Sequence, residues 1–148
     1  MNLTFSVAGG EFRSLKLDAT IANFEKNLKA GITASVIMVE GDIKKNELTG
    51  QILNVRSGAL RRSITHRVTR LPGGWQGQVG TNLIYAPVHE FGATIRAKHS
   101  AYLRFKAGGS WHSVREVTIP ARPFMRPALE NNIGAIIATI KAHVGRHL

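Results

Sequence analysis

Residues 17–43, LDATIANFEKNLKAGITASVIMVEGDI, decide the fold of this chain. Their apolar side chains recur at spacings of three and four, which is the period of one face of an α-helix. The stripe consists of Leu17, Ile21, Phe24, Leu28, Ile32, Val36, Val39 and Ile43. Asp18 or Ser14 is a candidate cap at the start, and Asn46 with Gly50 mark the end. Such a helix is about 40 Å long, so we expect it to pack on its own sheet and partly on a neighbouring subunit.

Strand patterns lie on both sides of this helix. Alternation of polar and apolar residues from Asn2 to Val7 predicts a first strand. Two further pairs of strands flank glycine-containing turns, which is typical of β-hairpins. The predicted hairpins are residues 64–70 with 75–80 across LPGG, and residues 102–107 with 111–119 across Gly108-Gly109-Ser110.

Residues 119–130, IPARPFMRPALE, lead into a second long helix. Pro120 and Pro123 keep the approach extended, and Pro127 is tolerated only in the first turn of a helix. The apolar stripe of this helix is Met125, Leu129, Ile133, Ile136, Ile137, Ile140 and Val144. The whole pattern predicts an α+β fold in a single domain, residues 1–148, with a long N-terminal helix and a C-terminal helix packed on an antiparallel sheet of about four to five strands.

Two local features refine this plan. A short helix is expected at residues 57–63, with Ser57 as its N-cap. Gly31 and Gly41 interrupt the first long helix, where they either soften it or allow another element to approach closely.

The charge of the chain is strongly positive and unevenly distributed. The net charge is +11, and the first 50 residues contribute none of it. Residues 51–148 contain 14 Lys and Arg but only three acids, Glu90, Glu116 and Glu130. This asymmetry favours contact with nucleic acid or an acidic protein surface, although a solvated basic face is the alternative. Cysteine is absent, and no segment is typical of a secretory signal or a membrane span, so a cytosolic product is expected.

The stretch YAPVHEFG, residues 85–92, contains a His-Glu pair that invites a catalytic interpretation. In an extended segment His89 and Glu90 point to opposite faces, and no nucleophile or orienting partner is evident. A zinc-binding HExxH motif needs histidine at the position of Ala93. We therefore expect a structural loop without metal or cofactor, in which Phe91 is buried and Glu90 pairs with an arginine. Gly92 is expected to adopt a positive φ.

Three stretches resemble one bacteriophage protein family. They are LTGQILNVRSGALRRSI (48–64), VGTNLIYAPVHEFGATI (79–95) and IPARPFMRPALE (119–130). In this order and spacing they are similar to the neck or tail-completion proteins of long-tailed phages, which include minor tail proteins of the lambda-like Z type. The resemblance implies a non-enzymatic structural protein of the virion, made in the host cytoplasm and located at the head–tail junction.

The resemblance also implies partners and contact residues. The expected partners are further copies of the chain in a ring, with a hexamer as the expected state, the connector or head-closure ring, the tail terminator, the tail tube and the double-stranded DNA in the lumen. No membrane and no small-molecule substrate is implied. The expected partner interface is Arg56, Arg61, Arg62, Tyr85, His89, Glu90, Phe91, Arg96, Lys98, Arg122 and Arg126. Leu3, Phe5 and Val7 are expected to add a strand across a subunit boundary.

Two alternatives remain open from the sequence. One is another ring of the same junction, a tail terminator or a head-closure protein. The other is a freestanding basic module that binds nucleic acid, with sheet aromatics near arginines as stacking residues. A nuclease requires clustered acids for metal ions, and the three scattered glutamates of residues 51–148 argue against one.

Overall fold

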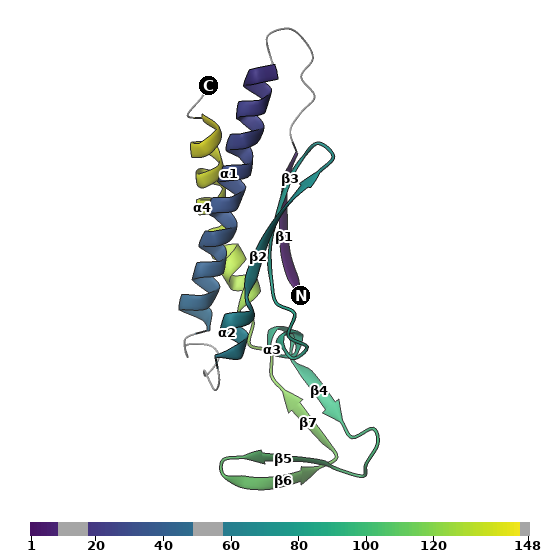
Figure 1. The fold of residues 1–148 in the computed structure, drawn as a ribbon. Helices are drawn as coiled ribbons and strands as arrows, with labels where there is room; N and C mark the ends of the chain where they lie inside the picture. Colours follow the sequence, from purple (N-terminus) through teal and green to yellow (C-terminus); the bar gives the residue numbers. More distant parts are fainter. Residues whose placement is uncertain (9–17, 49–57, 146–148) are drawn as a thin grey trace.

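The structure is a computed structural model, and it describes residues 1–8, 18–48 and 58–145. Its architecture is α+β, as the sequence predicts. Figure 1 shows two long helices, α1 (Asp18–Asp42) and α4 (Met125–Val144), side by side against a three-stranded sheet. Two short helices, α2 (Ala59–Ser63) and α3 (Ala86–Phe91), lie at the lower end of this body. A slender arm of four strands extends beyond them (Figure 1).

Helix α1 forms where the apolar stripe predicts it. It continues into one π-helical turn, η1 (Ile43–Glu47), before the described segment ends. The stripe is fully buried at Leu28, Ile32, Val36, Val39 and Ile43. Phe24, closer to the start of the helix, is exposed. Leu17 and the candidate caps Ser14 and Gly50 lie outside the described residues.

The three-stranded sheet is antiparallel, with the order β1–β3–β2. Strands β2 (Thr65–Leu71) and β3 (Gly74–Gly80) form the hairpin predicted around LPGG, and β1 (Asn2–Ala8) pairs with the other side of β3. Leu3 and Phe5 pack toward the core, whereas the polar residues that alternate with them along β1 are exposed. One face of the sheet therefore carries the helices, and the other is polar.

Two glycines allow α1 to pack closely on both of its neighbours. A Cβ at Gly77 of β3 would lie 2.5 Å from Cγ1 of Val36, so the helix can rest on this strand only if residue 77 lacks a side chain. A Cβ at Gly31 would lie 3.1 Å from the Cα of Ile140 in α4. Nothing lies within 4 Å of a Cβ at Gly41. Of the two glycines noted in the helix, Gly31 is therefore the one at a close approach.

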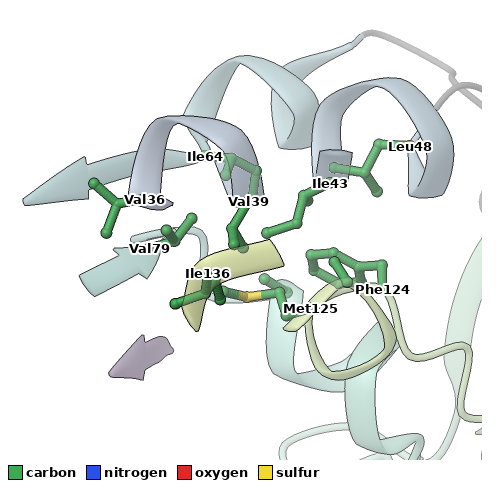
Figure 2. Close-up of a cluster of buried hydrophobic side chains, with 11 residues drawn as sticks. Val36, Val39, Ile43, Leu48, Ile64, Val79, Phe124, Met125 and Ile136 are labelled. Atoms are coloured by element: carbon green, nitrogen blue, oxygen red, sulfur yellow. The ribbon is translucent and has the colours of Figure 1, made fainter. Parts of the chain in front are cut away.

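The hydrophobic core lies where the lower halves of α1 and α4 meet the end of the sheet. Figure 2 shows Val36, Val39 and Ile43 against Phe124, Met125 and Ile136, with Ile64 and Val79 closing one side. Burying a side chain of this size contributes about 1.5–3 kcal/mol. The stripe of α4 is covered only in part, because Ile133 and Ile137 are 49% and 48% exposed.

The remaining strands form two separate ladders instead of extending the main sheet. β4 (Ala93–Arg96) pairs with β7 (Glu116–Ile119), and β5 (Leu103–Ala107) pairs with β6 (Ser110–Val114). The prediction of one strand over residues 111–119 was wrong, because the strand is interrupted at Arg115 and its second part pairs with β4. In the described part of the chain the seven strands thus belong to three antiparallel sheets, not to a single sheet of four to five.

Two local predictions also need correction. Residues 86–91 form the short helix α3 and not an extended segment, with Pro87 in its first turn. The N-cap of α2 is Gly58, at a φ of 68°, while Ser57 lies outside the described residues. Gly92, by contrast, has the expected positive φ, 72°.

Candidate protein-interaction surface

Glu90 is a structural carboxylate that caps the C-terminal helix. Its side chain is buried, with 4% of the residue exposed. Its two oxygens accept hydrogen bonds from the backbone N–H groups of Phe124 (2.8 Å), Met125 (3.0 Å) and Arg126 (3.0 Å). These N–H groups belong to the first turn of α4, which has no side-chain cap of its own. The carboxylate also lies at the positive end of the helix dipole.

The surrounding bonds join α3 to the proline-rich corner before α4. The backbone N–H of Arg122 donates to the carbonyl oxygen of His89 at 2.7 Å. A Cβ at Gly92 would lie 2.9 Å from the backbone nitrogen of Ala121, so the chain passes this corner closely. Two of the stretches that carry the phage resemblance therefore meet here. The prediction that Glu90 pairs with an arginine side chain was wrong, since its partners are backbone amides.

This arrangement offers no catalytic centre. The Glu90 carboxylate is committed to α4, and His89 contacts the ring of Tyr85 edge-on at 6.0 Å between centroids. Among the described residues, no three His, Asp or Glu side chains are placed to hold a metal ion. Nor does any helix of the described chain have the length and apolarity needed to cross a membrane.

Apolar side chains are exposed on both sides of α3. Ile84, just before the helix, is 94% exposed, and Phe91, its last residue, is 69% exposed. Tyr85 is exposed as well. The prediction that Phe91 is buried was therefore wrong. Its exposure next to a rigidly held carboxylate makes this segment a fixed, partly apolar surface.

The arm, residues 93–119, is basic and aromatic. It contains five Lys and Arg and one acid, Glu116, which pairs with Arg96 at 3.0 Å. The guanidinium of Arg115 lies 5.9 Å from the centre of the Tyr102 ring, and Phe105 stacks on His112 at 5.6 Å. Trp111 is 75% exposed. Lys98 is also exposed, close to the tip of the β4–β7 ladder.

The other predicted contact residues divide into three groups. Arg61 and Arg62 are exposed in the last turn of α2, and Arg122 is exposed in the corner before α4. Arg126 is exposed but bound to Glu130 at 2.8 Å. Arg56 lies outside the described residues. Figure 1 shows α2 and α3 at the end of the body from which the arm extends, so most of the predicted contact residues lie at this end or on the arm.

The prediction of a strand-adding segment concerns β1. Leu3 and Phe5 are partly buried against the protein's own core, and β1 pairs with β3 along its full length. Its other edge has no strand beside it among the described residues. Val7 lies in the same strand, opposite Trp75.

Most of the acids whose side chains the structure describes form hydrogen bonds or ion pairs within the protein. Glu25 accepts two hydrogen bonds from Arg70, each 2.6 Å, and these lower its pKa. Burial opposes ionisation of Glu40, but its bonds with Lys44 and His66 outweigh that effect and lower its pKa. Asp42 accepts a bond from Asn132 at 2.8 Å. Glu47 is buried, and desolvation together with the nearby carboxylates raises its pKa.

A polar hollow of about 740 Å³ lies at the end of the three-stranded sheet. Its lining includes Ser63, His66, Arg67 and Thr81. Ser63 and Thr81 bond to each other at 2.7 Å, and His66 bonds to Glu40. Neither hydroxyl group is bonded to His66, so these residues do not form an activated nucleophile with the histidine as its base.

Sequence reasoning missed several surface residues. Ile84, Arg104 and Lys106 are exposed, although none of them was named as a contact residue. Tyr102 and Trp111 are exposed too, but they were considered only as stacking residues for nucleic acid. A signal was present in residues 110–114, SWHSV, where a tryptophan stands among polar residues without a regular apolar face.

A comparison with known protein families identifies the family of this chain. The model of the phage virion morphogenesis family matches residues 38–144, which include most of the core, α3, the arm and α4. Comparisons with curated proteins and with solved structures give no match. Because the family match spans most of the chain, the protein belongs to the phage virion morphogenesis family, whose members are structural virion proteins and not enzymes.

Proposed function

We propose that this protein completes the tail of a long-tailed phage and joins it to the head at the neck. It acts as a homo-oligomeric ring, a hexamer, around the DNA channel, between the connector or head-closure ring and the tail terminator and tube. The observation that carries the proposal is the concentration of exposed basic and apolar side chains at one end of the molecule, on α2, α3 and the arm. Membership of the phage virion morphogenesis family supports a role for this surface in virion assembly.

Two features of the body support self-association. No strand of the described residues pairs with the outer edge of β1, and an unpaired edge strand is a ready site for a strand from another chain. The helix that contacts β1, α4, exposes Ile133 and Ile137 one turn apart on the same flank. A neighbouring copy that pairs along Leu3, Phe5 and Val7 would extend the sheet and cover this flank.

The basic residues are proposed to meet mainly protein. Each phosphate that a protein neutralises adds salt-sensitive affinity for DNA. A channel that DNA must traverse works poorly if it holds the duplex tightly. Arg61 and Arg62, exposed together at the end of α2, are therefore assigned to an adjacent ring.

Complementation of a phage that lacks this gene tests the assignment. Arg61→Glu combined with Arg62→Glu is expected to leave the protein folded, because both side chains are exposed, but to yield separate heads and tails. Lys26→Glu is the matched control, because Lys26 is an exposed base of α1 far from α2 along the helix. Normal yields of joined particles from the double variant would reject the assignment.

One observation favours a second function, binding of nucleic acid by the basic surface. The exposed arginines and lysines of residues 61–122 greatly outnumber the acids in that range. A gel shift with random duplex DNA at micromolar protein, with affinity falling steeply as salt rises, would support that function. Absence of a shift at physiological salt would reject it.

A further inference from the structure

The arm has no hydrophobic core of its own. None of its residues, 93–119, is buried, and its strands form two ladders of two strands each. Isolated two-stranded ladders are at best marginally stable in water. A segment of this kind gains stability when another surface covers one of its faces.

The exposed side chains of the arm have the composition of a binding hot spot. Trp111, Tyr102 and Ile95 are exposed, and tryptophan, tyrosine and arginine dominate the energetics of protein interfaces. Arg104 and Lys106 alternate with Leu103 and Phe105 along β5, so the basic side chains share one face of the strand. Neither base has an acidic partner among the described residues.

A second copy of this chain cannot supply the missing acids from its described surface. Glu25, Glu40, Glu116 and Glu130 are in ion pairs, Asp42 accepts bonds from asparagines, Glu47 is buried, and Glu90 caps α4. The two acids whose side chains are not described, Glu11 and Asp18, stand in a stretch that also contains Arg13 and Lys16. The chain therefore has no surplus of negative charge to offer the arm of a neighbour.

Duplex DNA satisfies only part of this chemistry. Its phosphates accept lysine and arginine, but contacts to the backbone leave an exposed indole and phenol ring without an apolar partner. A protein surface provides both an acidic rim and a pocket for the aromatic side chains.

We infer that the arm docks onto an acidic surface of a different protein, with Trp111 as its apolar anchor and Arg104 and Lys106 on the acidic rim. This assignment names the chemistry of one partner and does not depend on the neck position proposed above. Two different contacts are thus proposed for the molecule: the body contacts other copies of this chain, and the arm binds a different protein.

Binding to purified phage particles tests the inference. The probes are heads and tails from an infection that lacks this protein, a random duplex DNA of about 30 base pairs, and the protein itself. The wild-type chain is expected to bind heads or tails, and Trp111→Ala and Arg104→Glu/Lys106→Glu are each expected to weaken that binding at least tenfold. Lys26→Glu, a charge reversal at an exposed base of α1 outside the arm, is the matched control and is expected to bind normally.

A photo-crosslinking residue at position 111 then identifies what the arm touches. The expected product joins this chain to a single acidic virion protein. A product with DNA or with a second copy of this chain overturns the inference. So does unchanged particle binding by Trp111→Ala, or a loss confined to DNA binding or self-association. A different result is that the variants lose particle binding while labelling of virions excludes a position at the neck. That result would refute the proposed function and leave this inference standing.

Discussion

At the scale of single residues, Glu90 joins two segments that are distant in the sequence. Its carboxylate accepts hydrogen bonds from three backbone N–H groups at the start of α4. Removal of the carboxylate therefore leaves these donors without a partner. We expect Glu90→Ala to lower the free energy of unfolding by about 2–3 kcal/mol and Glu90→Gln by about half as much. Urea unfolding of the purified protein measures both.

The neighbouring residue provides the control for this prediction. His89→Ala removes a partly exposed ring whose only described contact is the edge-on approach to Tyr85, so its effect is expected within about 0.5 kcal/mol. Equal effects of His89→Ala and Glu90→Ala would show that the carboxylate does not hold α4.

Glu47 makes a second prediction at this scale, concerning pH. Its Oε2 atom is buried without a hydrogen-bond partner, and burial raises its pKa above the ordinary 4.5, with Asp42 and Glu90 adding to the effect. As pH rises, Glu47 therefore loses its carboxyl proton at a lower pH in the unfolded chain than in the folded protein. Above the pKa of Glu47 in the unfolded chain, this difference lowers the free energy of unfolding. Glu47→Gln is expected to stabilise the protein at pH 7 by about 1 kcal/mol.

The pH dependence distinguishes this cause from a general packing effect. Below pH 4.5 Glu47 is increasingly protonated in both states, so the advantage of Glu47→Gln is expected to shrink toward zero. Thermal unfolding of the two proteins, compared at pH 7 and near pH 4, measures the difference. Subtracting wild type from variant at each pH removes the separate effects of Glu25 and Glu40, whose pKa values are lowered. A constant advantage at both pH values would contradict the account.

At the scale of elements, the contact between α1 and α4 depends on one glycine. A Cβ at Gly31 meets backbone of α4 at 3.1 Å, which a side-chain rotation cannot relieve. We expect Gly31→Ala to destabilise the protein by about 1–2 kcal/mol. Gly41→Ala in the same helix enters open space and is expected to stabilise it by up to about 1 kcal/mol, through higher helix propensity. Chemical denaturation of both variants measures the two changes in stability. Changes of the same sign would contradict the account.

The elements that the sequence predicts well are those with a local pattern. The stripe of α1 and the hairpin around LPGG depend on residues close together in the chain, and both are present. Helix α3 was missed because six residues carry little periodicity, and its C-terminal end is held by bonds to residues 122–126. The pairing of β4 with β7 was missed for the same reason, since Arg96 meets Glu116 only in the folded arm.

The candidate surface was harder to predict than the fold. Arg61 and Arg62 could be named because an exposed base needs only a polar environment. Whether Phe91 is buried or exposed depends on which elements cover it, and a sequence pattern of six residues does not record that. The role of Glu90 likewise required knowledge of where α4 begins.

At the scale of the whole molecule, the flank of α4 is expected to join copies of the chain. Ile133→Glu combined with Ile137→Glu places charge on this half-exposed flank, and we expect the variant to remain folded but to stay monomeric at concentrations where the wild type associates. Asn131→Glu introduces the same charge at an exposed residue on another face of the helix and serves as control. Sedimentation velocity over a concentration series measures the mass. Identical masses for wild type and the double variant would remove α4 from the interface.

The division of charge in the molecule gives the account its central claim. Most of the acids whose side chains are described form bonds within the fold, and we propose that the surplus bases at the end formed by α2, α3 and the arm meet other virion proteins. The most direct test is electron microscopy of purified virions in which this protein carries a gold-labelled tag. The account predicts label at the junction of head and tail in nearly every particle. Label elsewhere on the virion, or virions without the protein, would contradict it.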